Sequence, residues 1–239
     1  MKLLEFFRNL SVGPLANLSM AQAGDPSGID PSKHEGLVLH TNEALTRLHG
    51  RFVLREGMMI VEEVEGRTTY PLESKYAMSN YDAGAGHAFF IQDQWGEPYR
   101  DDVIKVLEVF DTFGIKLPLN EADQPASLFT PQPRVLQVPH SYAGMALSIS
   151  YQANHPKIAY TESGSDFTQS VYVPESLSSA LSAYVAYKVY SGINSQENAV
   201  KAAEYLKMFE TICMECLEYD LIGTQSSSST ERFIKRGWM

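Results

Sequence analysis

Residues 174–220 read PESLSSALSAYVAYKVYSGINSQENAVKAAEYLKMFETICMECLEYD, a stretch with the spacing of two helices joined by a short turn. The first helix is predicted to begin at Pro174 and to end at Gly192, a residue type common just past helix ends. Asn194 and Glu197 then resemble a capping box for the second helix. So short a connection predicts an antiparallel helical hairpin.

In the second helix, residues at intervals of three or four form one face, and all of them are apolar except the last. On the first helix, three alanines alternate with three tyrosines, a pattern that allows close helix packing beside bulky rings. The face of the second helix consists of Ala202, Leu206, Phe209, Cys213, Cys216 and Asp220, and the alternating residues of the first are Ala180, Ala183, Ala186, Tyr184, Tyr187 and Tyr190.

The centre of the chain is predicted to form a small, mostly antiparallel sheet. Its strand-like stretches are rich in β-branched and aromatic residues. The first two flank Gly66 and the next two flank residues 111–113, which predicts two hairpins, and two single strands follow. The stretches are residues 58–64, 68–72, 103–110, 114–119, 134–138 and 146–151.

The N-terminal part is predicted to be helical. One or two short helices in residues 3–23 are interrupted at Gly13-Pro14, and Asp30-Pro31 starts a longer helix over residues 31–52. The predicted fold class is therefore α+β, an α-helical bundle with an inserted small antiparallel β domain and an extended flexible C-terminal tail. The predicted boundaries are 1–54 for the N-terminal helices, 55–173 for the β-rich insertion, 174–222 for the helical hairpin and 223–239 for the tail.

The last residues form a segment of unusual composition. Residues 224–230 are Ser-rich and predicted to be flexible, and Arg232, Phe233, Ile234, Lys235, Arg236 and Trp238 follow. Two interpretations are open, a frayed terminus and a tethered docking peptide. We favour docking because the exposed aromatic side chains are costly in water and three basic residues accompany them in an acidic protein.

Composition excludes several classes of function. The formal charge of −10 disfavours sequence-specific DNA binding, although a negative wall is compatible with a passage through which DNA slides. No stretch is apolar enough for a membrane span. The first residues resemble a signal peptide, with Ala21-Gln22-Ala23 as a cleavage site, but Glu5, Arg8 and Pro14 interrupt the apolar run. We expect a chain made in the cytoplasm.

Catalytic and cofactor motifs are weak. Cys213 and Cys216 have the spacing of half a zinc site or a redox pair, but we interpret them as small buried hydrophobic residues because no further ligands follow. Gly84-Ala85-Gly86 lacks the lysine of a phosphate loop, so a mobile loop is the better interpretation and the role of residues 84–87 stays open. The six histidines match no metal or triad spacing and are interpreted as scattered surface residues, although a triad assembled by the fold stays open. They are His34, His40, His49, His87, His140 and His155.

The order of the predicted parts carries more information than any single motif. An Asn-Glu-Ala-Leu element at 42–45 precedes the strand from Met58. The Thr69–Leu72 element, the turn ending in Lys116–Leu119, and the Ala183–Tyr190 and Ala203–Glu210 helices follow. Over about residues 37–222 this order resembles the head-to-tail adaptor (connector) family of short-tailed bacteriophages, the group that includes tail tubular protein A. The motifs are short and consist of common residues, so the resemblance rests on their order.

The resemblance implies a structural virion protein without catalytic residues or cofactor. Such adaptors form a ring, commonly a dodecamer, between the portal protein and the tail nozzle protein, and DNA passes through the channel. Their C-terminal tails insert into the portal, which by position assigns that contact to Arg232, Phe233, Ile234, Lys235, Arg236 and Trp238. The Tyr-rich helix faces would be covered by ring neighbours, with Tyr184, Tyr187, Tyr190 and Phe209 as the subunit-packing residues.

Two alternatives stay open. One is another neck or tail-completion protein of similar fold. Its location in the virus particle would distinguish it from an adaptor. The other is a metal-dependent hydrolase that uses the scattered histidines, which metal analysis of the purified protein tests.

Overall fold

The fold is α+β, and in the computed structural model the chain divides into two compact units. The structure describes residues 1–18, 20, 24–82, 84–93, 98–139, 144–161, 164–165 and 167–222. Residues Met1–Leu54 and His155–Thr224 form the first unit, called here the helical unit, and Arg55–Asn154 form the β unit. The chain therefore leaves the helical unit once, builds the β unit and returns.

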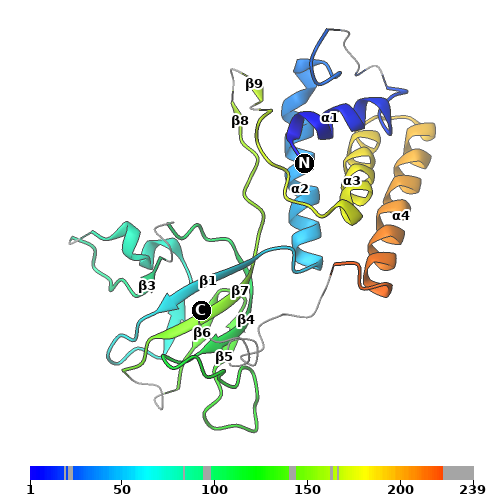
Figure 1. Ribbon diagram of the computed structural model, residues 1–239. Coiled ribbons are helices and arrows are strands. Elements are labelled where there is room, and N and C mark those ends of the chain that lie inside the picture. The colour runs from blue at the N-terminus through cyan, green and yellow to red at the C-terminus, as the bar shows by residue number, and fades with distance from the viewer. Residues whose placement is uncertain are drawn as a thin grey trace, which may run out of the picture. The chain divides into compact units, whose positions relative to one another are not determined.

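The helical unit contains four helices among the described residues, and α2, α3 and α4 run side by side with α1 lying across them (Figure 1). A short β-hairpin of β8 and β9 precedes α3. The bounds are α1 Leu3–Val12, α2 His34–Arg51, β8 Tyr160–Thr161, β9 Gly164–Ser165, α3 Ser178–Ser191 and α4 Gln196–Glu218.

The predicted start of the long N-terminal helix is confirmed. Pro31 begins a 3₁₀ turn that leads into α2, and the Asp30 carboxylate accepts the Ser32 N–H at 2.9 Å. The predicted apolar stripe is buried in the helical core, since Leu37, Leu45 and Leu48 are each at most 1% exposed.

The predicted helical hairpin is present as α3 and α4, with one correction at the turn. The residue that caps α4 is Ser195, whose hydroxyl accepts the Asn198 N–H at 3.2 Å. Asn194 lies one position too early, because the capping residue must have an extended backbone just before the helix and Ser195 has it.

The β unit contains two antiparallel sheets (Figure 1). The first has the strand order β3-β1-β7-β4 and the second the order β2-β6-β5. The strands of the first sheet are β1 Glu56–Val61, β3 Ile91–Gln92, β4 Val103–Phe110 and β7 Leu147–Ala153, and those of the second are β2 Thr69–Pro71, β5 Phe129–Gln132 and β6 Val135–Gln137.

The first predicted hairpin is wrong in its pairing, and the second is present only as a short antiparallel contact. β1 does not pair with β2, because β3 and β7 occupy the two edges of β1 and leave β2 to pair with β6. Residues 114–119 form no second strand beside β4. They turn back antiparallel to the end of β4, where Lys116 bridges Phe110 and the Leu117 N–H donates to the Val109 carbonyl at 2.8 Å. The contact ends at Pro118, which cannot donate to a ladder.

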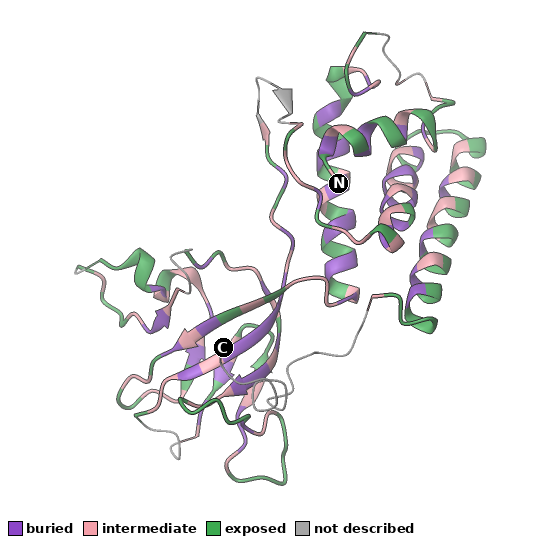
Figure 2. Cartoon of the chain, viewed as in Figure 1, coloured by how far each residue is buried: buried purple, intermediate pink, exposed green. Residues whose placement is uncertain are grey.

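Each unit has its own hydrophobic core. The helical core includes Phe6, Leu48, Leu181 and Phe209, and the β core includes Ile149 and residues from both sheets. Figure 2 shows the buried residues concentrated on the inward faces of the helices and along the central strands. None of the described helices combines the length and hydropathy needed to cross a bilayer.

Residues 155–173, expected to belong to the β-rich insertion, pack with the helices. The Asn42 side chain of α2 donates to the Ile158 carbonyl and accepts the Ile158 N–H, each at 2.9 Å. Val171 donates its N–H to the Met1 carbonyl at 2.9 Å and is buried in the helical core. The unit boundary at Asn154 is therefore earlier than the expected end of the insertion, because the half-buried Asn42 side chain on α2 holds the returning chain.

Candidate functional site

The end of α4 exposes a patch of large hydrophobic side chains. Met214, Leu217, Tyr219 and Leu221 are 59%, 41%, 68% and 58% exposed, and we call these four residues the α4 patch. Met214 and Leu217 are spaced by three residues, which brings them to one side of α4, and Tyr219 and Leu221 follow in the turn that ends the helix. In Figure 2 this end of α4 carries mostly exposed residues.

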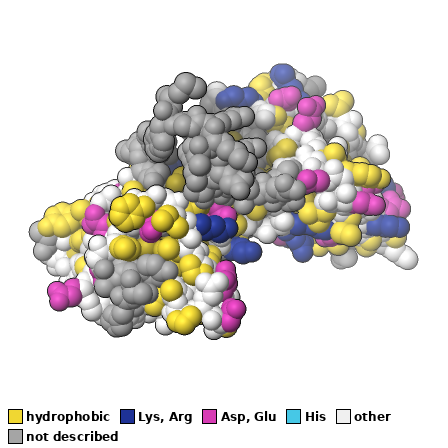
Figure 3. Space-filling view, turned by 60° about the horizontal axis from the view of Figure 1, so that its bottom comes forward, with side chains coloured by type: hydrophobic (Ala, Val, Ile, Leu, Met, Phe, Trp, Pro, Cys, Tyr) yellow, Lys and Arg dark blue, Asp and Glu magenta, His cyan; other side chains and the backbone are white. Residues whose placement is uncertain are grey.

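Acidic side chains surround the α4 patch. Residues 208–222 contain Glu210, Glu215, Glu218 and Asp220, all exposed, and no lysine or arginine. Glu210 is paired with Arg51 of α2 at 2.6 Å. Figure 3 shows hydrophobic, acidic and basic side chains side by side on one face of the molecule. An apolar and negative surface is complementary to a partner segment that is apolar and basic.

The helix termination fixes the position of the patch. Asp220 has a left-handed backbone with φ of 48° and donates its N–H to the Leu217 carbonyl. The Leu221 N–H donates to the Cys216 carbonyl at 3.1 Å. These are the two hydrogen bonds of a Schellman motif, which ends α4 and turns Leu221 back onto the helix.

The four aromatic residues expected to pack between subunits are engaged mainly within the chain. Tyr184, Tyr190 and Phe209 are at most 3% exposed and belong to the helical core, while Tyr187 is half-buried against it. Tyr184 lies edge-on to Phe209 with the ring centroids 5.1 Å apart. The rings pack α3 against α4 and so leave the outer surface of the hairpin to other side chains, chiefly the α4 patch.

The hydroxyl of Tyr184 joins a charged cluster between α2 and α3. It donates to Glu43 at 2.9 Å, and the same carboxylate oxygen accepts a hydrogen bond from the Lys188 ammonium at 3.0 Å. Burial alone would raise the pKa of Glu43, but the hydrogen bonds from Lys188 and Tyr184 outweigh it and hold the pKa below its ordinary value. Arg47 lies over the Tyr184 ring, 5.4 Å from its centroid. The cluster ties α2 to α3.

The predicted portal-docking residues, Arg232, Phe233, Ile234, Lys235, Arg236 and Trp238, lie outside the described residues. Gly84 and His87, whose role the sequence left open, are described. The Gly84 N–H donates to the Asp82 carboxylate at 2.9 Å, and His87 Nε2 lies 2.9 Å from the Lys75 carbonyl oxygen. These contacts are the local hydrogen bonds of a connecting segment.

Several histidines are buried rather than scattered on the surface. His34, His49 and His155 are at most 4% exposed, and His140 lies outside the described residues. The structure brings His49 and His155 together, with ring centroids 5.6 Å apart. Within the described part of the chain, no three His, Cys, Asp or Glu side chains are grouped so as to hold a metal ion.

The Thr46 hydroxyl lies 3.1 Å from His155 Nε2, a distance suited to a nucleophile and its base. However, the hydroxyl donates its proton to the Asn42 carbonyl at 2.9 Å. His155 Nε2 also lies 3.1 Å from the Asn42 carbonyl oxygen, and Nδ1 lies 3.0 Å from the Pro156 carbonyl oxygen, so backbone carbonyl groups engage both the hydroxyl and the ring. The arrangement fixes the returning chain on α2.

The two cysteines are buried, as predicted. Cys213 and Cys216 are 0% and 3% exposed in the helical core, and both are free thiols. Burial raises the pKa of the Cys213 thiol to about 11. A thiol with so high a pKa is a poor nucleophile and metal ligand at neutral pH.

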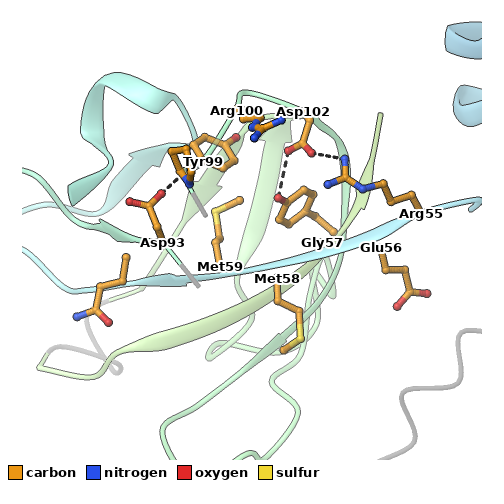
Figure 4. Close-up of a pocket in the computed structure, with 12 residues that line it drawn as sticks. Arg55, Glu56, Gly57, Met58, Met59, Asp93, Tyr99, Arg100 and Asp102 are labelled. Carbon is orange, nitrogen blue, oxygen red and sulfur yellow. Dashed lines mark hydrogen bonds and ion pairs between the residues drawn. The ribbon is translucent and has the colours of Figure 1, made fainter. Parts of the chain in front are cut away.

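The β unit contains a pocket of about 400 Å³ beside the start of β1 (Figure 4). Arg55 donates to the Asp102 carboxylate at 2.8 Å, and the Tyr151 hydroxyl donates to the other carboxylate oxygen at 3.1 Å. Across the pocket, Tyr99 donates its backbone N–H to Asp93 at 2.6 Å. Burial is the main cause that raises the pKa of Tyr99 and of Tyr151 above the ordinary value, so both phenols are neutral at physiological pH.

Three polar side chains of this pocket, Arg55, Asp102 and Tyr151, are joined by hydrogen bonds. Arg55, the first residue of the β unit, also donates to the carbonyl of Asn154, its last residue, at 3.1 Å. Its guanidinium therefore joins both ends of the unit to Asp102, the residue before β4. The cluster thus fastens the strand ends where the chain enters and leaves. No sequence motif indicated Arg55, Asp102 or Tyr151, because residues so far apart meet only through the order of the strands.

Comparison of the chain with protein-family models and with curated proteins finds no match in either set.

Proposed function

We propose that the protein is a ring-forming head-to-tail adaptor of a short-tailed bacteriophage, joining the portal protein to the tail nozzle protein. In this proposal the helical unit belongs to a bundle whose neighbouring copies surround a DNA channel. The β unit is an insertion on that bundle, and the C-terminal tail docks in the portal. The protein acts as a structural part of the virion rather than as an enzyme.

The α4 patch is the observation that carries this proposal. Four large side chains that are 41–68% exposed at one helix end are a costly arrangement for a chain that works alone. A neighbouring copy in a ring would cover them through a head-to-tail contact, which closes when the rotation between copies allows it. The order of parts that resembles the adaptor family supports the same assignment.

The charge of the chain fits a DNA passage. Copies that each carry a formal charge of −10 offer few contacts that would release the counterions of DNA. A channel lined by such subunits repels the phosphate backbone, which favours sliding over binding. The proposal therefore requires no sequence-specific contact with DNA.

Electron microscopy of the purified chain mixed with the portal protein of the same phage tests the proposal. We expect a ring of copies seated on the portal, even if the free chain is monomeric. The paired substitution Met214→Ser and Leu217→Ser should remove the ring, whereas Leu39→Ser, which changes a 61% exposed side chain of α2, should leave it intact. A portal that stays bare in the presence of the unaltered chain would refute the proposal.

Deletion of residues 224–239 tests the role of the tail separately. Circular dichroism should show an unchanged helical content, and affinity for the portal should fall at least tenfold because the aromatic and basic anchors are gone. Equal affinity with and without the tail would remove the docking assignment while leaving the ring in place.

A further inference from the structure

The α4 patch and the C-terminal tail are chemically complementary segments of one chain. Residues 208–222 carry four acidic and no basic side chains, while residues 223–239 carry Arg232, Lys235 and Arg236 against a single acid, Glu231. The tail also contains Phe233, Ile234 and Trp238, and the patch exposes four hydrophobic side chains. Each segment therefore offers both the apolar surface and the charge that the other lacks.

The connection between them is long enough. α4 rises about 1.5 Å per residue, so the stretch from Glu210 to Leu217 lies within roughly 20 Å of Ile222. The linker Thr224–Thr230 spans roughly 23 Å when extended. The Arg232–Trp238 segment can thus reach back over the last turns of the helix without strain.

We infer that, in the free protein, the tail segment Arg232–Trp238 docks on the α4 patch of its own chain. Phe233 and Trp238 cover Met214 and Leu217, and the basic side chains lie among Glu215, Glu218 and Asp220. A short Ser-rich linker gives the tail an effective concentration in the millimolar range at the patch, so even a weak contact is occupied. A second copy must reach the same surface from solution at much lower concentration.

This contact has a consequence for assembly. A docked tail covers the surface that a ring neighbour would use and holds back the segment that would enter a portal. Binding of the tail elsewhere would then uncover the α4 patch and couple the two events. The contact itself does not depend on the proposed function, whereas this coupling does.

Trp238 provides an intrinsic reporter of the contact. The chain has two tryptophans, Trp95 and Trp238, so the Trp95→Phe variant of the full chain leaves Trp238 as the sole indole. We expect its fluorescence to be blue-shifted and its quenching by acrylamide to be at least threefold weaker than in a free peptide of residues 224–239. Adding Met214→Ser and Leu217→Ser should restore quenching to the level of the peptide, and adding Leu39→Ser should not.

Three results would overturn the inference. Quenching of Trp238 in the full chain equal to that of the peptide would show that the tail is not docked. Protection that survives the paired substitution on α4 would place the tail elsewhere. Protection that disappears on dilution into the nanomolar range would assign the contact to a second copy. Because the measurement uses the isolated chain, none of these results bears on whether a ring forms on a portal.

Discussion

His155 is the buried residue whose protonation should matter most for stability. Burial lowers its pKa below the ordinary value of 6.5, His49 and Lys157 lower it further, and the carbonyl groups of Pro156 and Asn42 only partly oppose these effects. Between the lowered pKa and 6.5, the unfolded chain binds a proton that the folded chain does not. Stability is therefore full above this window and falls as the pH drops through it, by at most about 1.4 kcal/mol per pH unit.

Urea unfolding followed by circular dichroism at pH values of about 7 and 5 measures this effect in the helices. We expect His155→Gln to flatten the pH dependence, leaving a residual slope from His40, whose pKa is also lowered, mainly by burial. His87→Gln, which changes an exposed side chain in the β unit, is the matched control and should keep the slope of the unaltered protein. An unchanged slope in His155→Gln would refute the assignment.

At the scale of residues, the sequence predicted contacts that are local in the chain and missed those that are not. The Asp30 cap and the buried pair Cys213 and Cys216 follow from spacing along one helix. By contrast, the side chain of Asn42 meets Ile158, a contact between segments 116 residues apart. Periodicity within a helix cannot indicate a partner that only the folded chain brings close.

Among the elements, the pairing of β1 with β7 depends on a glycine. Gly57 lies opposite Tyr151 in the register of these strands, and a Cβ added at Gly57 would overlap the Tyr151 ring. Tyr151 in turn holds Asp102 beside Arg55. We expect Gly57→Ala to displace the ring and to cost about 1–3 kcal/mol in the stability of the β unit.

Hydrogen exchange of the β1 and β7 amides measures this loss, and a second background tests its cause. In a Tyr151→Val protein the ring is absent, so adding Gly57→Ala should cost much less than in the unaltered protein. An equal cost in both backgrounds would show that the glycine is required for its backbone and not for the space beside the ring.

The prediction of elements succeeded where periodicity was long and failed where pairing had to be chosen. α2 and α4 each repeat an apolar stripe over several turns, and α3 repeats alanine and tyrosine at helical spacing, so their existence followed from the sequence. Strands β1 and β4 were found in the sequence, but their partners were assigned to the next strand along the chain. Their ladders are formed with β7, about 90 and 45 residues later, and the predicted partner of β4 makes only a short contact at Lys116. The choice is set by burial of the whole sheet rather than by a local turn.

Across the whole molecule, the division of the chain follows from which core each segment joins. The sequence placed the start of the β insertion at residue 55, where helical spacing gives way to alternation. It placed the end at 173, whereas the contacts change at His155. Residues 155–173 carry no helical period, although Ile158 and Val171 within this range are buried in the helical core.

The two cores predict that the units lose structure independently. Leu181 and Ile149 are both 0% exposed, the first in the helical core and the second in the β core. Truncating either to alanine leaves a cavity that costs about 2–5 kcal/mol. If no buried hydrophobic cluster is shared, Leu181→Ala should increase hydrogen exchange in α3 and leave β7 unchanged, and Ile149→Ala should do the reverse. Equal destabilisation of both units by either substitution would instead show that the two units unfold as one cooperative fold.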